Sequence, residues 1–185
     1  MVVFDSVYLI ALTACVGSIL FFSFAVAPII FKVLGPESGG KFVRALFPRY
    51  YMWGAIWCAV ALPAAVAVPL CFPELRGPWV GIRALVVIAA ALVMLYAGNS
   101  LTPAINAASD AGAAGRDRFD RLHRLSVRLN SLVLLMGLGL LIAFAARQAP
   151  KTAGIIEPTP AERAAAESRA LRAGPFRRPA PSAPQ

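Results

Sequence analysis

The sequence predicts an all-α protein, an integral membrane four-helix bundle followed by a disordered C-terminal tail. Three observations predict it: an apolar composition, four long uncharged runs, and charges confined between those runs. Apolar residues make up 59% of the chain and the mean hydropathy is +0.70, whereas a soluble domain is about 45–50% apolar. Charged residues are only 15%, against roughly 25% in ordinary globular proteins. The chain is therefore expected to lie in lipid.

Four apolar runs have the length of a membrane span, about 20 residues at a rise of 1.5 Å per residue. With their flanks, the predicted spans are residues 7–30, 49–70, 80–103 and 124–146. Together they form a predicted transmembrane domain over residues 1–146. The first run is expected to be retained rather than cleaved as a signal peptide, because it is too long and Asp5 precedes it in place of a positive charge.

The C-terminal segment, residues 147–185, has a different composition. It is rich in Pro, Ala and Arg without apolar periodicity, which predicts disorder. Thr159, Pro160 and Glu162 form a capping box with proline at the first helical position, and Gly174 begins a stop signal. A short helix is therefore predicted over residues 160–173.

The net charge of +9 can indicate a nucleic-acid-binding protein, but here the Lys and Arg residues lie beside apolar spans. Nine of them fall in the first and third loops, against five within reach on the opposite side. The positive-inside rule then predicts cytoplasmic first and third loops, with both termini outside. The high Ala, Arg and Pro content indicates a bacterial cytoplasmic membrane. The expected partners are the lipid bilayer and a homo-oligomer or membrane partner, with no nucleic acid.

Residues that are unusual for a membrane protein collect at the span ends next to the first and third loops. Polar side chains are costly in lipid and mark function or helix packing. Antiparallel helices bring four such segments to one face of the membrane, and the opposite face shows no comparable set. The candidate residues of this polar face are Pro28, Phe47, Pro48, Tyr50, Tyr51, Asn99, Thr102, Pro103, Asn106, His123, Ser126 and Asn130.

Helical spacing refines this prediction. In the fourth span, one stripe at i, i+4, i+7 and i+11 is expected to face the bundle, and it comprises Phe119, His123, Ser126 and Asn130. Arginines occupy the opposite stripe, where they can reach lipid phosphates. In the third span, a second polar face comprises Tyr96, Asn99, Pro103 and Asn106, with Thr102 at its edge. The two stripes could satisfy one another by hydrogen bonds, or they could line a small polar cavity for a ligand, an ion or a lipid headgroup.

The sequence gives no direct sign of a metal, a cofactor or a catalytic centre. It has three cysteines without CxxC spacing, and Cys15 and Cys58 fall near the middle of spans, where cysteine acts as a small hydrophobe. His123 is the only histidine, so it cannot belong to a multi-histidine metal site. A single histidine can still ligate haem or relay protons. Nucleophile motifs, paired carboxylates and phosphate-binding glycine loops are absent from the sequence, which favours a protein that is not an enzyme.

Taken together, these segments resemble the transmembrane protein 205-like family, also catalogued as domain of unknown function 4149. The matching pieces are Ala27-Pro28 with Phe31, the run from Leu46 to Tyr51, Asn99 through Thr102-Pro103 to Asn106, and, most specifically, Phe119-x-x-Leu122-His123-x-x-Ser126-x-x-Leu129-Asn130. The resemblance covers about residues 5–146 and excludes the tail. It implies a four-helix membrane domain without a settled biochemical activity.

The preferred hypothesis is a non-enzymatic membrane protein that binds a small ligand, a lipid or a partner at the polar face. One alternative is a haem- or metal-handling redox protein that uses His123. Another is a small transporter that acts as a homo-oligomer, because four short spans leave little room for a pore within one chain.

Overall fold

The computed structural model describes residues 2–73, 77–148 and 160–173. The chain divides into two units, Met1–Arg147 and Gln148–Gln185. The first unit contains the helical bundle, and the second contains α6 (Pro160–Ala173). The predicted disorder of the rest of the tail lies outside the described residues.

Two helical hairpins build the first unit. The elements of the first hairpin are α1 (Val2–Phe21), the π-helical turn η1 (Phe22–Val26) and α2 (Ala27–Cys71). The elements of the second are α3 (Pro78–Tyr96), the π-helical turn η3 (Ala97–Leu101), α4 (Thr102–Asp110), the 3₁₀ turn η4 (Gly112–Gly115) and α5 (Arg116–Gln148). Within the described residues the structure contains helices and no strands.

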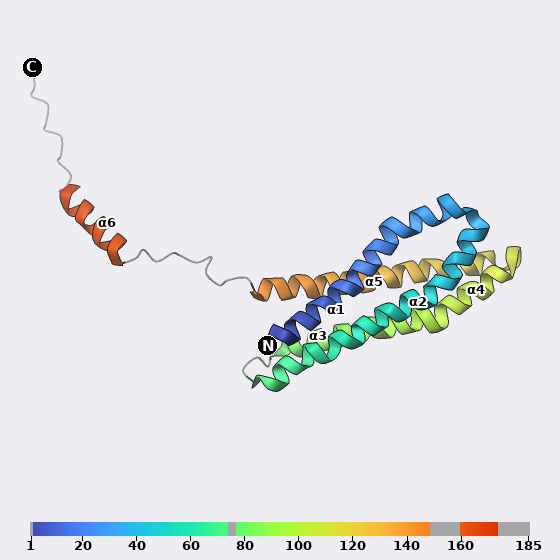
Figure 1. Cartoon of the computed structure of the whole chain (residues 1–185), viewed down its shortest axis with the longest axis horizontal. Helices are drawn as coiled ribbons and strands as arrows, with labels where there is room; N and C mark the ends of the chain where they lie inside the picture. Colours follow the sequence, from blue (N-terminus) through green and yellow to red (C-terminus); the bar gives the residue numbers. More distant parts are fainter. Residues whose placement is uncertain (1, 74–76, 149–159, 174–185) are drawn as a thin grey trace, which may run out of the picture. The chain divides into compact units, whose positions relative to one another are not determined.

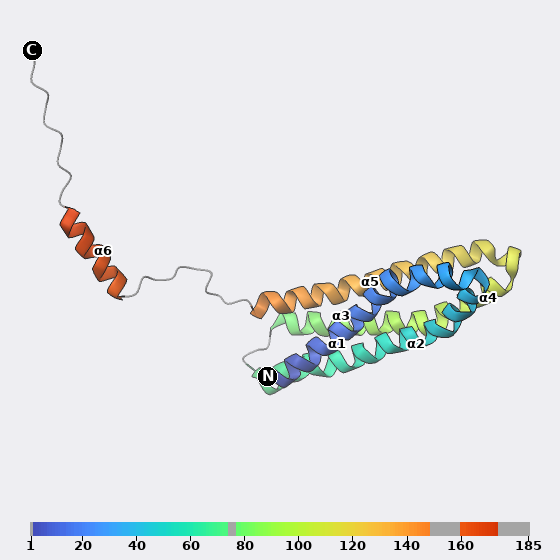
Figure 2. The same ribbon diagram turned by 45° about the horizontal axis from the view of Figure 1, so that its top comes forward.

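The first hairpin reverses inside α2, at Gly35. This residue has φ 71° and ψ 173°, a conformation that glycine adopts without steric cost. Pro36 then starts the return arm, which runs antiparallel to α1 (Figures 1 and 2). The second span was predicted to begin at residue 49, but the return arm is already helical from Pro36 and Pro48 lies within it. The bundle is therefore longer than the apolar span alone.

Three continuous helical stretches are long and apolar enough to cross a membrane: Val2–Cys71, Pro78–Asp110 and Gly112–Arg147. The first is folded back at Gly35, so the bundle has four long arms (Figure 1). The predicted fold class, an all-α four-helix bundle of membrane-spanning character, is confirmed. We call the end with Gly35 and η4 the turn end, and the end with Val2 and Arg147 the terminus end.

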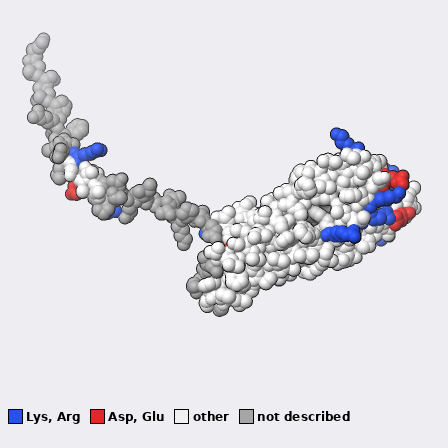
Figure 3. Space-filling view, in the orientation of Figure 1, with Lys and Arg blue, Asp and Glu red and all other residues white. Residues whose placement is uncertain are grey.

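Charged side chains gather at the turn end, while the remainder of the bundle surface is almost wholly uncharged in the same view (Figure 3). One ion pair there joins the two hairpins, with Arg44 Nη1 of α2 at 2.7 Å from Asp110 Oδ1 of α4. Both side chains are exposed, so the pair contributes only about 0–1 kcal/mol. The charges mark this end as the part of the bundle that meets headgroups and water.

Small residues let the four arms pack closely. A Cβ placed on Gly54 of α2 would lie 3.0 Å from the Sδ of Met94 in α3, and one placed on Gly137 of α5 would run into the side chain of Val16 in α1. Lipid gives helices no hydrophobic reason to associate, so close van der Waals contact of this kind holds a membrane bundle together.

The two hairpins repeat one plan, 75 residues apart. Pro28 and Pro103 each stand two residues after a five-residue π-helical turn, and Tyr51 and Ser126, which touch one another, have the same separation of 75. Proline has no N–H for the carbonyl four residues earlier and its ring presses against that carbonyl. A π-helical turn just before the proline widens the helix there, and the amides of Ala27 and Thr102 bond five residues back, to Phe22 and Ala97.

Candidate functional site

An aromatic cluster joins the two arms of the first hairpin towards the turn end. Phe22 of η1 packs against Phe47 and Tyr50 of the return arm, with ring centroids 5.5 and 4.9 Å apart. Tyr51 stacks on Phe47 at 5.8 Å and meets Tyr50 edge-on at 5.2 Å. Each such pair contributes about 0.5–1.5 kcal/mol beyond its buried area, so the cluster fixes the spacing of the arms.

Two hydrogen bonds tie this cluster to α5. The Tyr50 hydroxyl donates to Asn130 Oδ1 at 2.8 Å, and the hydroxyls of Tyr51 and Ser126 lie 2.7 Å apart. Tyr51 and Ser126 are only 3% and 7% exposed, so this bond is shielded from competing water. The structure thus brings together five of the residues predicted for the polar face, which are Phe47, Tyr50, Tyr51, Ser126 and Asn130.

The third span contributes to the site differently from the expectation. Thr102 is buried and its hydroxyl donates back to the Ala97 carbonyl at 2.8 Å, inside its own helix. Tyr96, Asn99 and Pro103 are exposed on the bundle surface, and Asn106 is half-buried. Ser126 and Asn130 of the fourth span therefore hydrogen-bond to tyrosines of the second span, and not to the third span as expected. Tyr96, Asn99 and Pro103 share one face of the third span, as the spacing predicted, but that face points away from the bundle.

His123 also departs from the expected stripe. It is exposed, whereas Ser126 is buried and Phe119 and Asn130 are half-buried. The imidazole lies parallel to the Phe119 ring at a centroid distance of 5.7 Å. Pro28 and Pro48, two further predicted residues, are exposed as well. Four predicted polar-face residues besides Asn99 thus lie on the outside of the protomer: Pro28, Pro48, Pro103 and His123.

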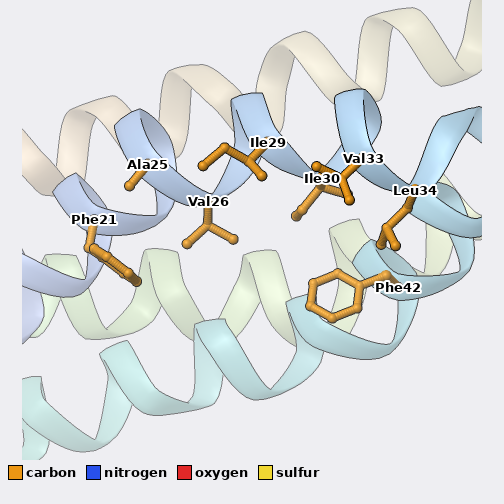
Figure 4. A pocket seen from close by; sticks show the side chains of 8 residues that line it. All are labelled: Phe21, Ala25, Val26, Ile29, Ile30, Val33, Leu34 and Phe42. Carbon is orange, nitrogen blue, oxygen red and sulfur yellow. The ribbon is translucent and has the colours of Figure 1, made fainter.

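An apolar groove opens beside the aromatic cluster, between the outgoing arm of the first hairpin (α1, η1 and α2 up to Leu34) and the return arm. Its volume is about 400 Å³, and its lining residues are Phe21, Ala25, Val26, Ile29, Ile30, Val33, Leu34 and Phe42. Val26, Ile30 and Leu34 point from the outgoing arm towards the return arm, which carries Phe42 on the facing side (Figure 4). Because Phe21 and Phe22 are neighbours, the aromatic cluster anchors one wall of this groove.

Two further pairs of residues in the bundle were not part of the predicted site. Cys15 of α1 and Cys58 of α2 are both 5% exposed, which agrees with their mid-span positions. At the terminus end, the guanidinium of Arg83 lies over the ring of Tyr8, 5.6 Å from its centroid. This pair was not among the residues predicted for the polar face.

The fold and these sites define a small helical membrane protein. The chain belongs to the family described as "Domain of unknown function (DUF4149)", whose model matches residues 10–114, more than half of the chain. The matched region contains the groove, the aromatic cluster and η3, while His123, Ser126 and Asn130 of α5 fall outside it. No curated protein and no solved structure matches the chain.

Proposed function

We propose that this protein is a multi-pass, non-enzymatic membrane protein with four spans that binds a phospholipid at its turn end. One observation carries the proposal: the groove between the outgoing and return arms of the first hairpin is lined by apolar side chains alone and lies next to the charged end of the bundle. An acyl chain matches such a lining, because the eight lining side chains carry no polar group that a polar ligand could pair with.

The charges at the turn end suggest what recognises the lipid. Lys32 is exposed and directly precedes the lining residues Val33 and Leu34, and Lys41 directly precedes Phe42. In the described part of the chain, Lys32 has no carboxylate within 4 Å, and Lys41 pairs with Glu37 at 2.7 Å in a fully solvated contact. Basic residues near a bilayer surface attract anionic headgroups by about 1 kcal/mol each.

Selectivity must come from these charges and from shape, not from hydrophobicity. Lipid tails surround the bundle in any case, so moving one into the groove gains van der Waals contact and no hydrophobic free energy. A groove held at fixed width by the aromatic cluster offers such contact on both sides of the chain. We therefore propose an anionic phospholipid of the leaflet at the turn end, which the count of Lys and Arg assigns to the cytoplasmic side.

Photocrosslinking in nanodiscs tests the proposal directly. Phosphatidylglycerol with a photoreactive diazirine on one acyl chain is expected to label mainly residues 21–42, and phosphatidylcholine with the same chains to label them several-fold less. Val26→Trp, which fills the groove, should cut this labelling roughly threefold or more, the change that about 0.7 kcal/mol of lost contact produces.

Ile88→Trp is the matched control, because Ile88 is an exposed residue on α3 away from the groove. It should leave the labelling of residues 21–42 unchanged. Labelling that spreads evenly over exposed apolar residues such as Leu92, Leu135 and Ile142 would contradict the proposal, as would a Val26→Trp variant labelled like the wild type.

A further inference from the structure

Arg83 places a cation in the packed part of the bundle at the terminus end. It lies five residues after Pro78, the start of α3, which is about 7.5 Å along the helix. Its side chain is half-buried over the ring of Tyr8, which is itself 1% exposed. Tyr8 in turn packs on Phe144 of α5, with ring centroids 6.0 Å apart. Three arms therefore fix the position of this pair.

The hydrogen-bonding groups of the pair are unused. Arg83 Nε and Tyr8 Oη are both buried and have no hydrogen-bond partner in the described part of the chain. Buried polar atoms without partners are rare in folded proteins, and each calls for a bound molecule or ion that satisfies it. Both groups can donate: the guanidinium has only donors, and the phenol has one O–H.

The charge of Arg83 is also not neutralised by the protein. Asp5, one turn before Tyr8 on α1, and Arg147 of α5 both lie close enough to act on it electrostatically. No salt bridge within 4 Å joins Arg83 to Asp5 among the residues that the structure describes. Among the described residues, Asp5 is the one carboxylate that acts on Arg83, against the second guanidinium of Arg147, so positive charge is in excess in this part of the structure.

We propose that Arg83 and Tyr8 form an oxyanion-binding site at the terminus end, which takes a phosphate group. A ligand with several acceptor oxygens would meet both unused donors and balance the excess charge, since charge-assisted bonds from arginine to phosphate are the strong ones. The phosphate belongs either to a phospholipid headgroup of that leaflet or to a soluble anion. This site is separate from the groove, at the other end of the bundle, and does not depend on it.

The test uses the full chain in a detergent without phosphate groups, monitored by thermal unfolding and native mass spectrometry. Dioleoyl phosphatidylglycerol should raise the melting temperature of the wild type by about 2–4 °C, and dioleoylglycerol, with the same chains but no phosphate, should not. Because the groove would bind the same lipid, Arg83→Gln is compared in a Val26→Trp background, where it should lose the shift that Val26→Trp retains and hold one bound phosphatidylglycerol fewer. Arg124→Gln, an exposed arginine at the turn end, should retain the same number as the wild type.

Sodium phosphate, compared with sodium chloride at equal ionic strength, distinguishes the two sources. If sodium phosphate raises the melting temperature and Arg83→Gln abolishes this rise, the site binds a soluble anion. If only the lipid raises the melting temperature, the site binds a lipid headgroup. If Arg83→Gln does not fold, Arg83→Lys and Tyr8→Phe take its place, and each should lose at least half of the shift. The proposal is overturned if these variants respond like the wild type, or if dioleoylglycerol is as effective as phosphatidylglycerol. Val26→Trp should keep this response, so failure here and failure at the groove remain distinguishable.

Discussion

The two hairpins share a backbone plan and differ in what they carry on it. Residues 75 positions apart are buried in both hairpins, in pairs such as Leu12 and Val87, Cys15 and Ala90, Ile19 and Met94, Cys58 and Val133, and Ala65 and Leu140. Each outgoing arm also contains a π-helical turn, and a proline stands two residues after it. The repeated plan therefore sets where each arm faces its neighbours, independently of which side chains fill the positions.

The difference between the hairpins lies at their tips. In the first hairpin, the chain between the π-helical turn and the reversal at Gly35 is apolar except for Lys32, and it lines the groove. In the second, the corresponding stretch is the short α4 with Asn106 and Asp110, and the reversal begins at Gly112 (φ 58°). The same helical frame therefore forms an apolar groove where its tip is largely apolar and a polar turn where its tip is polar.

Equivalent residues of the hairpins touch at both ends of the bundle, which places these contacts near an approximate two-fold axis. At the turn end the pair is Tyr51 and Ser126, and their hydroxyls satisfy one another. At the terminus end the pair is Tyr8 and Arg83, and their Oη and Nε atoms have no partner. The pair near the axis is therefore hydrogen-bonded at the turn end, while at the terminus end it has buried donors without a partner in the described part of the chain.

The largest stability effect is expected where the hairpins touch most closely, at Gly137 and Val16. Gly137→Val would force its new atoms into Val16, and overpacking of this kind costs about 1–3 kcal/mol. Leu62 occupies the position equivalent to Gly137, and Ala91 occupies the position equivalent to Val16. The large and the small residue are therefore exchanged in the equivalent pair. Thermal unfolding in detergent measures the cost.

Gly139→Val serves as the control, because a Cβ there would meet no atom within 4 Å. It lies two residues further along the same helix, so both variants bear the same helix-propensity change. Equal losses of stability in the two variants would mean that α1 and α5 do not pack as closely as the structure has them.

A smaller effect is expected from breaking the hydrogen bond between Tyr51 and Ser126, the pair near the axis at the turn end. Tyr51→Phe removes one hydroxyl and leaves the buried Ser126 hydroxyl without its partner. Interhelical hydrogen bonds in membranes contribute about 0.6 kcal/mol on average and about 1.7 at most. A double-mutant cycle with Ser126→Ala should give a coupling energy in this range, whereas additive effects would show that the 2.7 Å contact is not energetically formed.

How far the sequence predicts this site can be judged from the same residues. Apolar run lengths and helical spacing place Tyr50, Tyr51, Ser126 and Asn130 at one end of the bundle, because both depend only on the rise and period of a helix. The choice of partners was not predictable, since helical spacing shows that Asn99 and Pro103 share a face but not which way that face points. Pro103 indicates a distorted helix, but it does not say whether the helix kinks or widens.

The groove and the pair at the terminus end were beyond sequence reasoning for a different reason. The groove depends on how far apart the outgoing arm and the return arm lie, which is a tertiary distance. Arg83 counted in the sequence only as a loop charge that helps to set topology. Its position 7.5 Å into α3, over a buried tyrosine, follows from how α1 and α3 are staggered, and no pattern along one helix encodes that stagger.

The two prolines provide a sharper comparison of the hairpins. Pro28→Ala and Pro103→Ala each restore an N–H that can bond four residues back and convert the π-helical turn into regular helix. Stability should change by less than about 1 kcal/mol in either variant. Only Pro28→Ala should reduce lipid labelling of residues 21–42, because only the first hairpin has a groove there. Equal labelling in both variants would show that the bend at Pro28 does not create the groove.

The smallest effect is expected for His123→Ala. His123 occupies the position equivalent to Pro48, and both residues are exposed, so the repeated plan turns this position away from the bundle in each hairpin. Loss of the exposed imidazole that stacks on Phe119 should change the free energy of unfolding by at most about 0.5 kcal/mol. Thermal unfolding of this variant beside Tyr51→Phe measures the change. An optical spectrum and metal analysis of the same two samples test the redox alternative. A Soret band or stoichiometric metal that is present in the wild type and lost in His123→Ala would mean that this outward position completes a site with a second chain or a cofactor, and would make the second hairpin, not the first, the functional one.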